Sequence, residues 1–408
     1  MDVVVVLVFV FVYLGMIWGR YPRLALDRTG IAVLGAIALL ATGRISLRDA
    51  WGAVDISTMT LLLGLMVLSA QFRLSGFYAS LTRRVAAAGV SPPVLLALLI
   101  GVVGLLSALL VNDIVCLAVA PLLVEGCSRR GLYPLPFLLG LACAANVGSA
   151  ATLIGNPQNI LIGQTLGLSF SGYLLDSCVP SALGLAATWL VICRVFRGKW
   201  HRPVPAPVVE APAFDAWQTA KGLVLLGALV TAFLFAPWPR DVLALAAAGI
   251  LLLSKRMASR TMLGLVDWHL LLLFAGLFVV NRVLQTSGTL GQMMAGVGST
   301  GVNLAAAGWL FVVTVALSNL VSNVPAVILL LPAATHPLAG PILALASTFA
   351  GNLLIVGSIA NIIVVEQAER LNLRITWWEH MKVGVPVTAV TLALAAGWLY
   401  LRACGLPW

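Results

Sequence analysis

The chain has 408 residues, of which 61% are hydrophobic and only 9% charged, and its formal net charge is +10. Soluble domains carry about 25% charged residues, so this composition excludes an ordinary soluble fold and equally a disordered or collagen-like chain. The basic residues are spread over a chain too apolar to present a solvated basic face, so they do not indicate a nucleic-acid partner. We therefore expect a polytopic membrane protein embedded in a lipid bilayer.

Apolar segments of the length needed to cross a bilayer, about 17–25 residues, follow one another along the chain. The first, 3–18, lacks a basic leader and a cleavage site and is interpreted as a retained helix. The other expected spans are 29–43, 57–72, 134–166, 175–196, 219–237, 241–254, 267–285, 342–365 and 384–402. Two further apolar segments, 93–127 and 304–335, carry polar residues at their middle and are interpreted as re-entrant hairpins. The Pro-rich segment 197–218 is the expected cytoplasmic linker.

The sequence also aligns with itself at an offset of about 211 residues, which shortens to 202 at residues 155–159, and this indicates an internal repeat. The clearest matches are Val54-Asp55 with Val266-Asp267, Gly64 with Gly276, Ser75-Gly76 with Ser287-Gly288, Ser107 with Ser318, Asn112 with Asn323, Pro121 with Pro332, Gly155 with Gly357 and Asn159 with Asn361. We therefore expect two repeats, 1–196 and 219–408, each with five transmembrane helices and one hairpin.

An odd number of spans per repeat places the second repeat upside down in the membrane. With both termini outside, five basic residues fall outside and the other 19 of the 24 fall on the cytoplasmic side, as the positive-inside rule requires. Those five are Arg44, Arg48, Arg240, Arg282 and Arg402. The expected fold is thus an all-α polytopic protein of the cell inner membrane, built from two inverted-topology repeats. Hairpin 93–127 would enter from the cytoplasm and hairpin 304–335 from outside.

Four interruptions of apolar segments place polar residues at mid-membrane depth, where they are costly. Two are the hairpin turns, and two are breaks in the spans 134–166 and 342–365, at 155–159 and 357–361. Helices that unwind at this depth offer half-helix ends, carbonyls and amides to a substrate, which is typical of secondary transporters. Helix capping and helix packing are the alternative explanation for any single residue. The candidate substrate-binding residues are Asn112, Thr152, Asn156, Asn159, Ser322, Asn323, Ser358 and Asn361.

One acid, Asp113, lies at a hairpin tip, and its repeat mate is the neutral Val324. Burial favours the neutral form of a carboxyl group, which suits a proton carrier, and the same group could coordinate a sodium ion. The alternative is that Asp113 caps the second arm of the hairpin. No Lys or Arg lies near the expected centre, which favours a neutral or weakly charged substrate.

Other chemistry is not indicated by the sequence. It has no phosphate-binding loop, no HExxH and no nucleophile elbow, so we expect no enzymatic activity and no cofactor beyond the ion gradient. The six cysteines show no disulfide or metal-ligand spacing. The four histidines, His201, His269, His336 and His380, fall near expected span ends or loops.

The motifs at 112–113, 151–159 and 322–325 resemble the ion transporter superfamily over nearly the whole chain. That group includes arsenite/antimonite efflux permeases, dicarboxylate:sodium symporters, citrate:metal carriers and some sodium/proton antiporters. The compact helix count, the Asn112-Asp113 pair and the Ile375-Thr376-Trp377 stretch are most similar to the arsenical-pump branch. The Ser-Asn-Thr tips of the dicarboxylate branch are absent, whereas the 155–159 loop is closer to the wider anion-transporter group.

The resemblance implies proton-coupled export of arsenite or antimonite by an elevator-type movement of the hairpins and broken helices against a scaffold. It also implies a cytoplasmic ATPase subunit and a homodimer partner as candidate partners. The alternatives are a sodium-coupled symporter of divalent or dicarboxylate anions, a sodium/proton antiporter and an anion channel.

Overall fold

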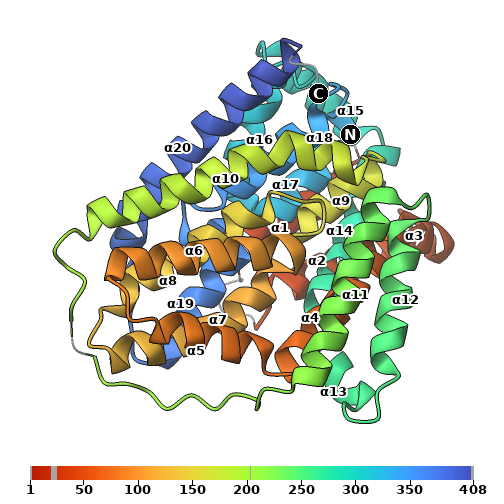
Figure 1. The fold of residues 1–408 in the computed structure, drawn as a ribbon. Coiled ribbons are helices and arrows are strands. Elements are labelled where there is room, and N and C mark those ends of the chain that lie inside the picture. Colours follow the sequence, from red (N-terminus) through yellow and green to blue (C-terminus); the bar gives the residue numbers. More distant parts are fainter. Residues whose placement is uncertain (1, 20–24, 203, 406–408) are drawn as a thin grey trace.

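The computed structural model describes residues 2–19, 25–202 and 204–405, and the regular elements of these residues are helices (Figure 1). Arg20 and Arg23 of the expected cytoplasmic set, Pro203 of the linker and the terminal residues 1 and 406–408 of the expected repeats lie outside the described residues. Six of the described helices are long and apolar enough to cross a membrane, namely α4, α6, α10, α11, α14 and α20.

The same order of helices occurs before and after the helix-free segment 196–215. The first half contains α1 (Val3–Trp18), α2 (Arg28–Ala41), α3 (Leu47–Ala53), α4 (Ile56–Leu74), α5 (Phe77–Ala87), α6 (Pro92–Leu109), α7 (Asn112–Arg129), α8 (Pro134–Ser149), α9 (Pro157–Thr165) and α10 (Phe170–Val195). The second half contains α11 (Ala216–Phe235), α12 (Arg240–Leu252), α13 (Ser259–Leu263), α14 (Trp268–Thr286), α15 (Thr289–Ser299), α16 (Ala307–Val321), α17 (Asn323–Leu330), η1 (Leu331–Ala333), α18 (Ala339–Ala350), η2 (Ile355–Gly357), α19 (Ile359–Arg370) and α20 (Trp377–Ala403).

Residues that match in the sequence alignment have matching structural roles. Asp55 and Asp267 are the N-caps of α4 and α14, and each carboxylate accepts from the backbone N–H three residues further on, at 3.0 and 2.9 Å. Gly76 and Gly288 precede α5 and α15 with φ of +70° and +71°, a left-handed conformation that glycine adopts without a steric penalty. The repeated residues therefore set where equivalent helices begin.

The glycines Gly64 and Gly276 explain how the two halves interlock. A side chain at Gly64 of α4 would place its Cβ 2.7 Å from the backbone of Ala244 in α12, and a side chain at Gly276 of α14 would come equally close to Ala32 in α2. Small residues allow such close helix crossings in membranes. Each half thus packs its fourth helix against the second helix of the other half, and α1, α2, α4, α11, α12 and α14 form a first helix group.

A second helix group contains α6–α10 and α16–α20. Within it α6 packs on α8, α16 on α18, and the two longest helices, α10 and α20, pack on each other. Figure 1 shows α5, α13 and much of the 204–215 segment along the lower edge of the molecule, whereas α15 and the end of α20 lie at the upper edge. The unwound stretches after α8 and α18 lie inside this second group, where they are buried.

Candidate functional site

Two unwound segments, 150–156 and 351–358, hold their shapes with the same hydrogen bonds. In the first, Asn159 Nδ2 donates to the carbonyl oxygens ten and seven residues before it, at 3.3 and 3.0 Å. In the second, Asn361 Nδ2 donates to the carbonyl oxygens ten and seven residues before it, at 2.8 and 3.1 Å. Because buried backbone groups must find partners, these two amides replace the helical bonds that the breaks remove.

The helices that follow the breaks are capped by matching residues. Asn156 Oδ1 accepts from the backbone N–H of Asn159 at 2.9 Å, and Ser358 Oγ accepts from a backbone N–H of α19 at 3.2 Å. Each cap also reaches the other half: Asn156 Nδ2 donates to Thr348 Oγ1 at 3.3 Å, and Ser358 Oγ donates to Asn146 Oδ1 at 2.8 Å. Thr348 and Asn146 occupy equivalent places in α18 and α8, so the two bridges are reciprocal.

Asn146 lies at the centre of the polar network. Its Nδ2 donates to Asn352 Oδ1 at 2.9 Å and to Asn361 Oδ1 at 3.0 Å, and all three side chains are buried. Gln158 Nε2 adds a further bond between the halves, to Thr348 Oγ1 at 3.2 Å. No Lys or Arg side chain of the described residues donates to these amides. The two unwound segments therefore meet in an uncharged, hydrogen-bonding interior.

The tips of the helix pairs α6–α7 and α16–α17 rest against these segments. In the first pair, Asn112 N donates to Gly155 O at 3.2 Å, and Thr152 Oγ1 donates to Ala108 O. A side chain at Gly155 would collide with the carbonyl of Ser107, which is why only glycine fits there. The structure thus brings the candidate residues Asn112 and Thr152 to one place.

The tip of the second pair is held by Asn323. In the amide orientation that satisfies both ends of this side chain, its nitrogen donates to Gly357 O at 3.0 Å and Ser347 O at 3.1 Å, and its oxygen accepts from Gln158 Nε2 at 3.2 Å. The preceding residue, Ser322, has φ +75° and ψ 162°. This is a conformation that is essentially restricted to glycine, so the second tip carries backbone strain.

Asp113 lies in the first turn of α7 and is partly buried. The N-cap of α7 is Val111, and no side chain makes a capping hydrogen bond there, so the alternative that Asp113 caps this helix is wrong. The Asp113 carboxyl group makes no hydrogen bond or ion pair with another described residue. The carboxyl group is therefore available to a proton or a cation.

Three buried oxygens beside the first unwound segment have no hydrogen-bond partner. They are Ser107 Oγ, Asn112 Oδ1 and Asn159 Oδ1. An uncharged oxygen-only donor set of this kind suits a hard cation such as sodium. Among the described residues, no three His, Cys, Asp or Glu side chains come close enough to hold a metal ion.

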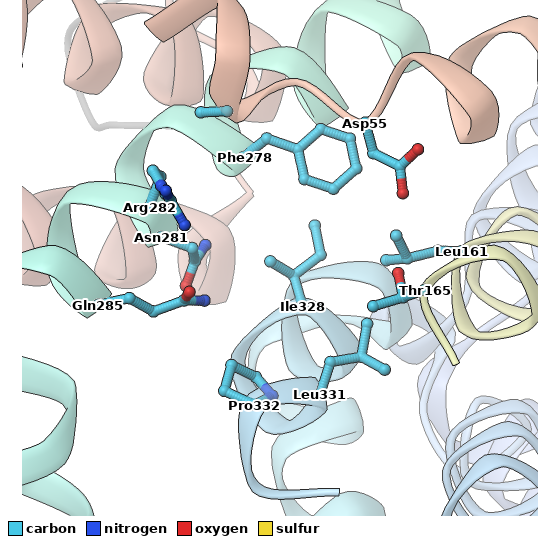
Figure 2. Close-up of a pocket in the computed structure, with 11 residues that line it drawn as sticks. Asp55, Leu161, Thr165, Phe278, Asn281, Arg282, Gln285, Ile328, Leu331 and Pro332 are labelled. Carbon is cyan, nitrogen blue, oxygen red and sulfur yellow. The ribbon is translucent and has the colours of Figure 1, made fainter. Parts of the chain in front are cut away.

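A cavity of about 320 Å³ lies between the two helix groups (Figure 2). Asp55, Asn281 and Arg282 line it from the first group, whereas Thr165 and Pro332 line it from the second. The lining residue Asn281 accepts from Tyr13 Oη through Oδ1 at 3.2 Å, and Pro325 O lies 3.4 Å from the same hydroxyl. Ile328, Leu331 and Pro332 also line the cavity, so it lies beside the end of the second arm of the α16–α17 pair.

Several members of the network were not among the sequence candidates. Tyr173 Oη donates to Ala150 O at 2.8 Å, and His380 Nε2 lies 3.0 Å from Asn352 O, an equivalent place in the second half. His380 was expected near a span end, yet it is only 2% exposed and contacts the unwound segment. The offset of 202 residues that relates Gly155 to Gly357 also maps Asn146 onto Thr348, which is the signal that could have found Thr348.

Comparison with known proteins gives consistent matches. The family described as citrate transporter matches residues 13–350. An uncharacterized transporter of Mycobacterium tuberculosis is 30% identical, over 98% of this chain and 99% of that protein. The silicon efflux transporter LSI3 of Oryza sativa subsp. japonica is 28% identical, over 91% of this chain and 92% of its own. The crystal structure of the Alcanivorax borkumensis YdaH transporter covers 99% of both chains, with a TM-score of 0.61 at 16% identity, so the two proteins share a fold.

Proposed function

The chain belongs to the citrate transporter family, and we propose that within it the protein exports a small uncharged oxyacid, with arsenite and antimonite as the first candidates, in exchange for protons. It is a multi-pass membrane transporter and not an enzyme. The observation that carries the substrate proposal is the amide and hydroxyl network that joins the two unwound segments without a basic side chain.

The chemistry of that network favours a neutral hydroxide over a carboxylate. Arsenite is largely an uncharged trihydroxide near neutral pH, so its O–H groups can donate to amide oxygens and accept from amide nitrogens. A citrate or other multiply charged anion would lose its hydration without a cation to replace it, which is costly in a low-dielectric interior. The similarity to a silicon efflux transporter supports the same class, because silicic acid is also an uncharged hydroxide near neutral pH.

The architecture we propose is the pair of inverted repeats expected from the sequence, with α6–α7 and α16–α17 as the two re-entrant hairpins. Reciprocal packing of α4 on α12 and of α14 on α2 supports it. Contacts between distant segments also support this architecture, because each contact joins two residues that the topology places on the same side of the membrane. They are Arg44 with Asp2, Arg240 with Leu168 and Arg402 with Asp176 on the outside, and Tyr133 with Trp200 in the cytoplasm.

The proposed transport step is a movement of the second helix group, which carries the network, against the first. The cavity of Figure 2 then is the outer entrance, since Asp55 and Arg282 line it and the topology places both outside. Substrate would be held by Asn112, Thr152, Asn156, Asn159, Ser322, Asn323, Ser358 and Asn361. Asp113 would release a proton on one side and take one up on the other, which couples the movement to the gradient.

Transport into everted membrane vesicles tests this proposal. An imposed proton gradient should drive accumulation of arsenite and antimonite by the wild-type protein. In Asp113→Asn the gradient-driven rate should fall by at least about 100-fold, because proton transfer at one group commonly accounts for that factor. Asn112→Ala should weaken substrate binding, and Glu210→Gln in the exposed linker is the matched control. Full gradient-driven transport by Asp113→Asn would show that the proton-carrier role is wrong. If the wild type transports neither arsenite nor antimonite, the substrate assignment fails.

Sodium coupling is the second candidate, because Ser107 Oγ, Asn112 Oδ1 and Asn159 Oδ1 are buried without partners. If sodium binds there, it should raise the thermal stability of the purified protein above that in potassium. Asn159→Ala should abolish this difference, whereas Asn361→Ala should preserve it, since the Asn361 oxygen already accepts from Asn146. No sodium effect in the wild type would leave the proton as the coupling ion.

The remaining expectations are location and partners. We propose that the protein lies in the inner membrane with both termini outside, that it forms a homodimer and that a cytoplasmic ATPase subunit is a candidate partner. Crosslinking in membranes and co-purification with tagged protein test the two partners separately.

A further inference from the structure

Another cavity, with charged residues among its lining, lies where α5 contacts α7, far along α7 from its Asn112–Asp113 end. The cavity measures about 260 Å³, and the residues that line it are Arg83, Ala86, Ala87, Leu122, Glu125, Gly126, Arg129 and Arg130. It contains three arginines and one acid, so its net charge is positive. None of these residues belongs to the network of the candidate transport site.

Glu125 organises this cavity. Its side chain is only 5% exposed, and it accepts from Arg129 at 2.6 Å and lies 3.6 Å from Arg83. A buried carboxylate requires such partners, and in return it holds two guanidinium groups in place at the mouth of the cavity. Arg83 and Arg129 remain about half or more exposed, with side-chain exposures of 51% and 65%, so each still presents N–H donors outward.

The floor of the cavity is fixed by close packing. A side chain at Gly126 would place its Cβ 2.4 Å from Ala86 Cβ, so glycine is what lets α5 lie directly on α7. Arg130 donates to the carbonyls of Ala86 and Val90 at 2.9 and 3.0 Å, which ties the end of α7 to the end of α5. The arginines therefore surround a space whose shape is fixed by helix packing, and they do not form a loose cluster on the surface.

We propose that this cavity binds the phosphodiester headgroup of an anionic phospholipid on the cytoplasmic side. Guanidinium pairs match phosphate oxygens in geometry and charge. α5 is a short amphipathic helix between α4 and the first hairpin, with Tyr78, Ala79, Thr82 and Ala86 buried, and such helices lie at headgroup depth. Basic pockets at that depth are the usual sites for anionic headgroups.

The equivalent helix in the other half differs. α15 (Thr289–Ser299) carries no charged residue, and the position that matches Glu125 in the repeat alignment is His336. The positive-inside rule explains why basic residues gather on one side, but it does not explain a buried acid that orders them. The headgroup would contact both α5 and α7, the second arm of the first helix pair.

Native mass spectrometry of the full-length protein, stripped of lipid in neutral detergent, tests the site by titration with phosphatidylglycerol and with phosphatidylcholine. This proposal rests on the membrane orientation proposed above but not on the substrate, so its failure is separate from failure of arsenite transport. The wild type should bind phosphatidylglycerol about tenfold more tightly than phosphatidylcholine, since each basic contact near the surface contributes modestly.

Two matched variants complete the test. Arg83→Gln with Glu125→Gln and Arg129→Gln removes the cradle without leaving a buried charge unpaired, and should reduce the preference to about twofold or less. Arg194→Ala with Arg197→Ala removes two exposed basic residues near the end of α10 and should leave the preference unchanged. The proposal is overturned if the triple variant keeps the preference, if the control loses as much, or if millimolar inorganic phosphate displaces the lipid completely, since the site would then serve free phosphate.

Discussion

The two helix-pair tips occupy equivalent places but differ in chemistry. The tip at 111–113 has ordinary backbone angles and carries the acid Asp113, whereas the tip at 322–324 is uncharged and has the strained Ser322. The unwound segments beside them, in contrast, repeat the same hydrogen bonds almost atom for atom. The difference teaches that the two halves share the shape of the unwound segments, while the acid lies in one half and the strained residue in the other.

Removing the acid from the first tip, so that both tips are uncharged, should have the largest effect on transport. Asp113→Val copies Val324 of the second tip, and we expect proton-driven transport to fall by at least about 100-fold because no other described carboxyl group lies at a tip. Proton movement recorded with a pH-sensitive dye in proteoliposomes measures it. Proton movement at the wild-type rate in this variant would mean that the two tips are equivalent after all.

A larger side chain at either of the two glycines where helices cross closely, Gly64 and Gly276, should destabilise the protein by the same amount. Gly64→Leu and Gly276→Leu each force a side chain into the backbone of the partner helix, at an expected cost of about 1–3 kcal/mol in the free energy of unfolding. Thermal unfolding with detection of monodisperse protein measures the loss. Gly227→Leu in α11 is the control, because its Cβ meets nothing within 4 Å. If only one of the two leucine variants loses thermal stability, only one half of the protein depends on its close helix crossing.

Glycine substitutions at the tips should have opposite signs. Ser322→Gly relieves a conformation that costs about 1–3 kcal/mol, so the melting temperature should rise. Val111→Gly, at φ −60°, relieves no strain, adds backbone freedom to the unfolded chain and also removes a buried side chain, so it should lower the melting temperature. Differential scanning fluorimetry checks both, and a fall for Ser322→Gly contradicts the assignment of strain.

The smallest effect should come from the residues that hold the unwound carbonyls. Tyr173→Phe loses the bond to Ala150 O and the bond that Tyr173 Oη accepts from Asn159 Nδ2, and such bonds in membranes contribute about 0.6 kcal/mol each. His380→Phe should cost a similar amount at the equivalent place, Asn352 O. Equal, small shifts in melting temperature support the equivalence. A shift that appears only for His380, and only at one pH, would instead make the second half a pH-sensitive element.

Much of the fold follows from the sequence because its signals are local. Apolar length indicates the helices, Asp55 and Asp267 are N-caps of α4 and α14, and Pro157 follows the break at Asn156 where α9 begins. The short helices α3, α5, α13 and α15 were not expected, since they are too short to register as spans. The candidate amides Asn112, Asn156, Asn159, Asn323 and Asn361 do come together around the two unwound segments, because one repeat places them.

The sequence by itself determined the membrane class, the repeated order of helices and the polar interruptions, because each depends on neighbouring residues or on a self-alignment whose offset holds over long stretches. Only the tertiary structure decided which polar groups meet: Asn146 with Asn352 across the halves, His380 against the second unwound segment, and Glu125 among its arginines. It also decided that Asp113 does not cap α7. The physical reason is that a buried polar group must be satisfied by whichever partner packing brings to it, and packing between distant segments has no local signature.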